Sequence, residues 1–342
     1  MNSKQRIAAI NRGDRVDRLP FLPTIFEHSA RLIGRTPSET ALDEDLLVEA
    51  QMKAYSIYGH DAVTVGVDVY NIEAEALGCK IKYHEDNSIP GVISHPFERQ
   101  CDFESITFSL NKGRIKKILN AAEKINRRIG NEVNVGVGIS GPFSVSVELT
   151  GYENIMMDCI DADVKVHKML ETVLEFQKRY CDEIIKRGLG VSIFESWATL
   201  PLVSPSIYKE YVMPYEKELI HHIKGKNTAA VPLVIGGDTT PIVDNIMETG
   251  TTLLVADYKA DIGMFTEKAS KKNLLVRGNI DPKLVQKGSR EEIIVCVKNI
   301  LDRVRGYDRF VLGTGVIPYD TPVENVLAIR EYLEHMAETA SL

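Results

Sequence analysis

Short apolar runs rich in β-branched residues alternate with helix-periodic segments along almost the whole chain. Each apolar run ends in a polar or glycine-containing tip, and a helical segment follows. The clearest runs are 62–67, 133–139, 191–194, 231–235, 252–256, 274–276 and 310–312. A unit of strand, polar tip and helix that repeats seven or eight times is typical of parallel α/β proteins. It predicts a (β/α)8 TIM-type barrel.

An open, doubly wound sheet would show a similar alternation. Such a sheet usually carries a glycine-rich nucleotide turn near its start, and this chain has none there. The segment 77–108 departs from the pattern because it is irregular and β-rich, so we expect an insertion near the barrel mouth. No linker rich in Pro, Gly or Ser interrupts the 342 residues, of which 44% are apolar. We therefore expect a single barrel domain over residues 1–342.

The composition argues against nucleic-acid-binding, secreted and membrane-spanning proteins. The net charge of −7 is spread without long runs, which argues against nucleic acid as the main partner. The amino-terminal segment is polar, and no stretch is apolar enough to suggest a signal peptide or a membrane span. The five cysteines are odd in number and none are spaced as C-x-x-C, which is typical of a reduced, cytoplasmic protein.

Two acids stand where ligand sites form in parallel barrels, just past the carboxyl ends of strands. Asp68 follows the run 62–67 and is accompanied by Tyr70, whereas Glu195 follows 191–194 and precedes Trp197, the single tryptophan. A carboxyl beside a large ring can have a raised pKa and act as a general acid, or it can bind a metal. The structural alternatives are that Asp68 caps a helix and that Glu195 starts one. We predict Asp68 and Glu195 as catalytic residues.

Four further residues at predicted strand ends are candidate ligand contacts. Asp238 follows two glycines, which permit close backbone approach to a ligand, although it could equally be a helix N-cap. Asn279 and Thr314 lie near later strand ends, and His28 is a candidate acid or base near the first strand.

The predicted mouth has few positive charges, which favours a neutral or cationic ligand. Arg277 is the basic residue nearest to it in the sequence pattern. We expect Arg277 to pair with Asp257 or Asp281.

Six segments in order resemble the uroporphyrinogen decarboxylase superfamily, most closely its corrinoid-dependent methyltransferase branch. They cover nearly the whole chain: Asp68 with 73–79, then 141–143, 204–205, 237–241, 278–282 and 321–325. The resemblance implies a β/α barrel. It also implies methyl transfer that involves a corrinoid.

Members of this branch that alkylate a thiol hold zinc with a His-x-Cys pair at a strand end and a later Cys. The matching positions here are Val234, Ile235 and Gly236. No Cys follows Cys296, and no His lies between residues 222 and 335. We therefore expect no thiolate zinc site, and we assign no residue as a metal ligand. A carboxylate-rich site for a harder ion, formed by Glu195, Asp238, Asp257 and His28 at one rim, is the alternative that the spacing leaves open.

The decarboxylase activity is the first alternative that the resemblance implies. Asp68 matches the acid that grips pyrrole N–H groups in those enzymes. However, the stretch 19–28 lacks the arginines that would bind substrate carboxylates and contains Glu27 instead. Thr314 stands where a histidine is expected. A non-catalytic corrinoid- or tetrapyrrole-binding barrel is the second alternative.

The resemblance thus favours a cytoplasmic methyltransferase of a corrinoid-dependent system. It would move a methyl group between a small methoxyaromatic or methylamine-like donor and a corrinoid protein that carries the cobalamin. Asp68 and Glu195 would handle the proton or the leaving atom, while Asp238 and Asn279 would orient the substrate. Tyr70 and Trp197 would form the walls of the substrate pocket. A homodimer through exposed helices is compatible with this architecture.

Overall fold

The computed structural model describes residues 1–98, 108–162, 164–226 and 230–340. Eight parallel strands form one sheet in the order β1-β10-β9-β8-β7-β6-β5-β2. Their bounds are β1 Phe21–Thr24, β2 Ala62–Val65, β5 Asn134–Ser140, β6 Gly190–Phe194, β7 Pro232–Val234, β8 Leu253–Ala256, β9 Leu275–Ile280 and β10 Phe310–Val316. This is the predicted barrel. Whether the whole chain is one folding unit stays a prediction.

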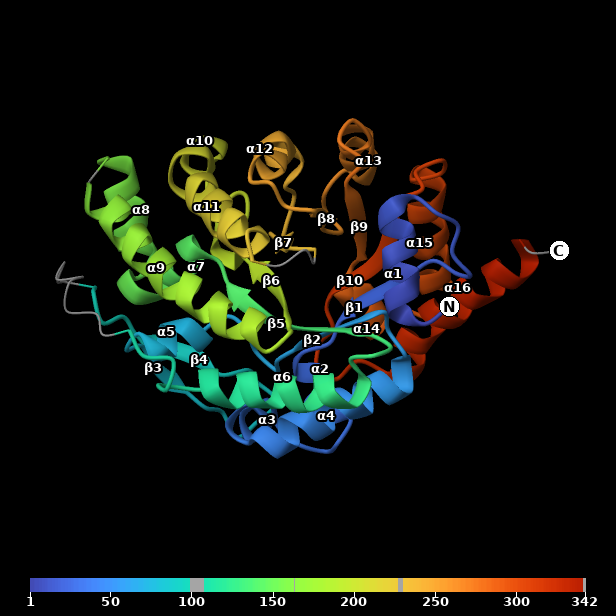
Figure 1. Cartoon of the computed structure of the whole chain (residues 1–342), viewed down its shortest axis with the longest axis horizontal. Helices are drawn as coiled ribbons and strands as arrows, with labels where there is room; N and C mark the ends of the chain where they lie inside the picture. The colour runs from blue at the N-terminus through green and yellow to red at the C-terminus, as the bar shows by residue number, and fades with distance from the viewer. Residues whose placement is uncertain (99–107, 163, 227–229, 341–342) are drawn as a thin grey trace.

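Helices surround the strands, as Figure 1 shows, with α4 and α6 along one side of the barrel and α16 leading to the carboxyl terminus of the chain. Capping boxes start three of them, at Asn2 with Gln5, Thr36 with Glu39 and Ser289 with Glu292. The longer helices are α1 Ser3–Arg12, α4 Glu44–Tyr58, α6 Ile115–Ile129, α7 Pro142–Thr150, α8 Tyr152–Ile160, α9 Val164–Lys186, α11 Met213–Lys224, α13 Ile262–Ser270, α15 Arg290–Arg303 and α16 Val323–Ala340. The shorter ones are α2 Glu27–Arg31, α3 Pro37–Leu42, α5 Ile72–Ala76, α10 Pro205–Ile207, α12 Val243–Glu248 and α14 Pro282–Lys287. No helix in these described ranges is both long and apolar enough to cross a membrane.

The predicted β-rich insertion contains a two-stranded antiparallel sheet, β3 Lys80–Lys82 with β4 Gly91–Ser94. Residues 99–107 of the predicted segment lie outside the described residues. Two strands extend further than the sequence pattern indicated. Asn279 lies inside β9 and Thr314 inside β10, so neither residue is in a loop past a strand end.

The barrel interior contains two separate apolar layers. The lower layer includes Leu22, Leu253 and Val311, and α1 contributes Ile10 to it, so this helix covers the amino-terminal end of the barrel. The upper layer is formed by three residues at the carboxyl ends of strands: Phe26, Val69 and Phe194. Phe26 and Phe194 meet edge to face, with ring centroids 5.5 Å apart.

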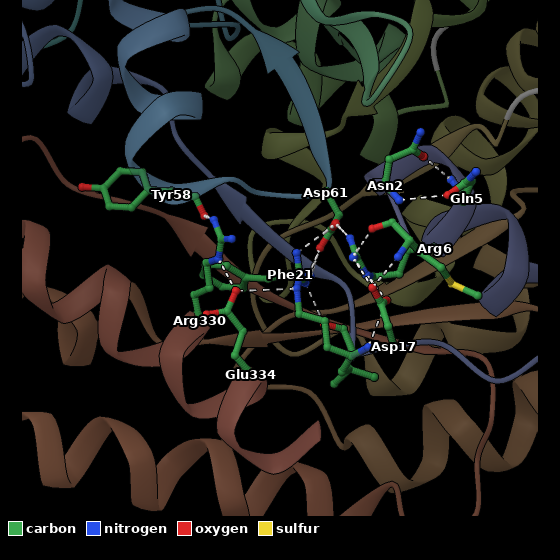
Figure 2. Close-up of polar contacts among 12 residues, drawn as sticks. Asn2, Gln5, Arg6, Asp17, Phe21, Tyr58, Asp61, Arg330 and Glu334 are labelled. Carbon is green, nitrogen blue, oxygen red and sulfur yellow. Dashed lines mark hydrogen bonds and ion pairs between the residues drawn. The ribbon is translucent and has the colours of Figure 1, made fainter. Parts of the chain in front are cut away.

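The junction between β1 and β2 closes the barrel through one buried carboxylate, Asp61. Its backbone N–H donates to the Phe21 carbonyl at 2.9 Å, and its side chain accepts from the Phe21 N–H at 2.8 Å. Arg6 and Arg18 donate to the same carboxylate at 2.5 and 2.7 Å. Figure 2 shows how Arg6 also reaches Asp17, so α1, β1 and the start of β2 meet at this group.

Replacing this carboxylate tests its role in closing the barrel. Asp61→Asn leaves two arginines without a buried counter-charge, and loss of one partner from a buried ion pair typically costs about 3–5 kcal/mol. We expect urea unfolding at pH 7 to show a decrease of that size in the free energy of unfolding. Asp14→Asn, which removes the exposed pair with Arg12, should change it by no more than about 1 kcal/mol. A similar small change in Asp61→Asn would contradict the assignment.

Candidate functional site

A pocket of about 410 Å³ opens at the carboxyl end of the barrel strands. Tyr70, from the segment after β2, and Trp197, from a 3₁₀ turn after β6, both line it. The β3–β4 hairpin contributes its Ile89–Val92 segment to the opposite wall. The structure therefore brings together the two aromatic residues predicted as walls, and the predicted insertion does lie at the barrel mouth.

Trp197 is oriented by a carboxyl that sequence reasoning did not select. Its indole N–H donates to Glu148 of α7 at 2.8 Å, and its ring stacks on Tyr152 with centroids 5.5 Å apart. Glu148 also lines the pocket, and burial raises the pKa of its carboxyl. The pocket thus combines aromatic walls with an acid.

Glu195 lies beneath this pocket and is fully buried. Its Oε1 accepts the backbone N–H of Ser144 at 2.6 Å, and the Ser144 hydroxyl accepts the Trp197 N–H at 3.0 Å. Gly141 allows the close approach, since a Cβ there would stand 1.9 Å from the Glu195 carboxyl. Burial raises the pKa of Glu195 to about 7. Glu195 therefore contacts the peptide chain that positions Trp197 and does not line the pocket.

Asp68 is 1% exposed and ion-paired. Arg114 donates to its Oδ2 at 2.6 Å, and the Tyr70 backbone N–H donates to its Oδ1 at 3.1 Å. Arg114 also contacts Glu75 at 2.8 Å and Asn71. Both carboxylate oxygens of Asp68 are therefore occupied, and the residue orients the backbone that carries Tyr70.

Glu27, at the start of α2 just past β1, lies close enough to Asp68 and Tyr70 to affect their electrostatics. Its side chain is partly buried and forms no ion pair or side-chain hydrogen bond with another described residue. Burial, and secondarily the charge of Asp68, raise the pKa of Glu27 to about 7. Glu27 is therefore an accessible carboxyl that holds a proton near neutral pH.

Asn279 and the backbone of Thr314 meet through Arg277, whose side chain lines the barrel interior. Arg277 donates from Nε to Asn279 at 2.8 Å and from Nη2 to the Thr314 carbonyl at 2.7 Å. The Thr314 hydroxyl accepts the Thr24 N–H at 3.2 Å. The expectation that Arg277 forms an ion pair with Asp257 or Asp281 is wrong, because no ion pair of the described residues contains Arg277. Asp257 acts on it only through a longer-range charge. Asp281 instead accepts the Lys283 N–H at a helix start.

His28 and Asp238, like Asn279 and Thr314, are not among the residues that line the pocket. His28 is buried, with Nε2 2.7 Å from the Tyr58 hydroxyl and Nδ1 3.1 Å from the Tyr319 carbonyl. Burial lowers the pKa of His28, so the ring is neutral. Asp238 is exposed, and its carboxylate accepts the Thr240 N–H at 3.1 Å in a turn. The N-cap of the helical turn that follows is Thr239, so the alternative of Asp238 as the N-cap is wrong.

The residues at the mouth do not fit a thiolate zinc site. The end of β7 presents Val234 followed by Gly236, and β10 presents Thr314. Cys79, Cys159 and Cys181 are buried, and Cys101 lies outside the described residues. Over the described ranges, no group of three or more His, Cys, Asp or Glu side chains could hold a metal ion. The absence of a metal stays a prediction.

The sequence contained a signal for two of the residues that we did not select. Glu27 follows the first strand as Asp68 follows the second, so the strand-end rule applied to it equally. Arg277 and Asn279 are two residues apart in β9 and therefore share a face of the strand. Glu148 lay mid-helix, and only the packing of α7 against Trp197 identifies it.

Comparisons with known proteins agree with this architecture. A family model described as uroporphyrinogen decarboxylase (URO-D) matches residues 2–336. A methylcobamide:CoM methyltransferase MtbA from Methanosarcina mazei is 27% identical over 96% of this chain and 96% of its own length. A uroporphyrinogen decarboxylase from Geobacter sulfurreducens is 25% identical over 95% of this chain and 97% of its own.

The structural comparison supports the same fold. A solved methyltransferase from Methanosarcina mazei superposes with a TM-score of 0.87 at 22% identity, covering 98% of this chain and 99% of that one. The predicted superfamily, the predicted similarity of this chain to methyltransferases and the predicted barrel are therefore confirmed.

The raised pKa of Glu27 predicts that the free energy of unfolding decreases as the pH rises from 4.5 to about 7. Its folded pKa of about 7 exceeds the ordinary value of 4.5, so the native state binds the proton more tightly than the unfolded chain does. The contribution of Glu27 to stability is full below pH 4.5 and is lost as the pH rises to about 7. Glu27→Gln should therefore be more stable than the wild type by about 1–3 kcal/mol at pH 8 and equal to it at pH 4.

Chemical unfolding of both proteins from pH 4 to pH 8 measures this difference. Glu267→Gln, an exposed carboxyl on α13, should follow the wild type at every pH. A constant difference between Glu27→Gln and the wild type across the range would show that Glu27 titrates normally.

Proposed function

Because the chain belongs to the uroporphyrinogen decarboxylase family and resembles methylcobamide:CoM methyltransferases over 96% of its length, we propose that it is a methyltransferase of a corrinoid system. It would transfer a methyl group between a small donor and a corrinoid held by a partner protein. The observation that carries the proposal is the placement of Glu27 just past β1, near Tyr70 of the aromatic pocket, where burial raises the pKa of its carboxyl to about 7.

The chemistry of demethylation explains why such an acid is useful. A reduced corrinoid supplies the nucleophile that accepts the methyl group. The bond from carbon to the donor heteroatom breaks, and the heteroatom keeps the electron pair and needs a proton. Glu27 holds a proton near pH 7 and has no partner side chain to occupy it, so we assign it that role for a methoxyaromatic or methylamine-like donor.

The two acids selected from the sequence have supporting roles in this proposal. Asp68, whose oxygens are occupied by Arg114 and the Tyr70 N–H, holds Tyr70 in place. Glu195 holds Ser144, which in turn holds Trp197. We propose both as positioning residues, with Asn279 available on the inner face of β9 and Asp238 on the rim.

The surface around the mouth supports docking of a protein. Several exposed apolar side chains lie in segments that follow strands, and these segments share one end of the barrel. Ile160 at the end of α8 and Val164 at the start of α9 are 67% and 79% exposed. Similar residues follow three other strands: Ile93, Leu202, Tyr258 and Met264. Such a surface fits a partner that delivers its corrinoid to the pocket.

The role of Glu27 can be tested with purified protein, reduced corrinoid protein and a panel of methoxyaromatics and methylamines. Glu27→Gln should lower the rate of donor demethylation by about 10²- to 10⁴-fold, which is the usual contribution of a general acid. In the wild type the rate should fall as the pH rises above about 7, because the acid loses its proton, and Glu27→Gln should lose this dependence.

The measurement is the appearance of demethylated product by mass spectrometry, and Glu267→Gln is the control. Wild-type activity in Glu27→Gln would refute its role. If no donor is demethylated but uroporphyrinogen loses carboxyl groups, the decarboxylase alternative holds. If neither reaction occurs and a corrinoid or porphyrin binds tightly, the non-catalytic alternative holds.

Docking can be tested separately from chemistry. Ile160→Asp and Val164→Asp place a charge on the proposed docking surface, so we expect the KM for the corrinoid protein to rise at least about tenfold. The rate with free cobalamin should stay unchanged. Val295→Asp is the matched control, because Val295 is 53% exposed but lies on α15, away from the segments that follow strands. An equal effect in all three variants would exclude the assigned surface.

A further inference from the structure

A small cavity of about 80 Å³ lies inside the barrel between the two apolar layers. Leu22 and Leu253 of the lower layer and Phe26 and Phe194 of the upper layer border it. One water occupies about 10–15 Å³ of such volume, so the cavity has room for several water-sized groups. It is distinct from the larger pocket at the mouth, with which it shares no lining residue.

Arg277 enters this cavity as a partly buried cation without a carboxylate partner. The two fully buried arginines of the described residues both have one: Arg6 pairs with Asp61, and Arg114 pairs with Asp68. Arg277 forms no ion pair within the described residues, and Asp257 contributes only a longer-range charge. A buried charge is costly unless it is paired, so this arrangement calls for an anion.

Hydrogen bonds hold the guanidinium on one edge and leave the other edge open. Nε donates to Asn279, and Nη2 donates to the Thr24 hydroxyl at 2.6 Å and to the Thr314 carbonyl. Nη1 has no acceptor among the described residues. Gly313 of β10 makes room for the group, since a Cβ there would lie 2.1 Å from Arg277 Nε. The side chain is therefore fixed with two N–H donors unused.

The rest of the cavity lining suits an anion. No Asp or Glu lines it, whereas the hydroxyls of Thr64 and Ser192 do, and neither of these hydroxyls has a hydrogen-bond partner among the described residues. His60, which also lines the cavity, is buried and neutral because burial lowers its pKa to about 4. The cavity thus offers one cation and two hydroxyl donors, with no fixed negative charge.

We propose that the barrel interior is a binding site for a small monovalent oxyanion, held by Arg277 with Thr64 and Ser192. A carboxylate matches the cavity in size and charge, because one of its oxygens can accept from Nη1 while the hydroxyls of Thr64 and Ser192 donate to the other. The anion is either a free ion or the head group of a longer ligand whose body lies above the Phe26 and Phe194 layer. The proposal does not depend on methyl transfer, because it concerns binding alone.

Isothermal titration with sodium formate tests the site, with sodium gluconate, which is too large for the cavity, keeping the ionic strength constant. The wild type should bind formate saturably, and its unfolding temperature should rise with formate but not with gluconate. Arg277→Gln should bind formate on the order of 10- to 100-fold more weakly, because a charge-assisted hydrogen bond is lost. Arg303→Gln, an exposed arginine on α15, should bind as the wild type does.

A second variant keeps the test decisive if Arg277→Gln does not fold. Gly313→Ala retains the charge but displaces the guanidinium, so it should also weaken formate binding. Butyrate separates the two sources of the anion: binding as tight as that of formate indicates a head group, and exclusion indicates a free ion. Absence of saturable formate binding to the wild type, or equal binding by Arg277→Gln, would overturn the proposal.

Discussion

The buried carboxylate of Asp61 is the interaction on which the rest of the structure depends. β1 and β2 are the two end strands of the sheet order, so the barrel closes only where these two strands meet. In the described residues, the hydrogen-bonded contact at their junction is confined to Phe21 and Asp61. Asp61 supplies that contact by accepting the Phe21 N–H and neutralising Arg6 and Arg18. Closure at this seam brings the segment after β1 beside the segment after β2, which places Glu27 next to Asp68 and Tyr70.

The carboxyl groups of the barrel divide into two electrostatic classes. Asp61 and Asp68 are buried and ion-paired with arginines. Glu27, Glu73 and Glu195 have no cation at bonding distance, and burial raises the pKa of each, to about 7, 8 and 7 respectively. The position of arginines therefore separates the ion-paired acids from those with a raised pKa. Of these three acids with a raised pKa, Glu27 alone is not fully buried.

The two spaces in the molecule have opposite chemical character. The pocket at the mouth has aromatic walls and one lining carboxyl, Glu148, whose pKa is raised by burial, and Glu27 lies near its Tyr70 wall. The interior cavity has an unpaired cation and no acid. Arg277 connects the two levels, because it holds Asn279 on the same face of β9. An anion bound to Arg277 would therefore affect the orientation of a residue near the mouth.

The sequence by itself determined the barrel, its hairpin insertion and the aromatic pair Tyr70 and Trp197, because strand and helix periodicity and strand-end position are local properties. Family membership also followed from ordered local segments. Only the tertiary structure decided which acids are free to react. Arg114 reaches Asp68 from 46 residues away, and Ser144 reaches Glu195 from 51 residues away, so both predicted acids have partners that no local pattern identifies. Burial and pairing are set by residues distant in sequence, and for this reason only the packed barrel shows that Glu27 and Arg277 have no ion-pair partner among the described residues.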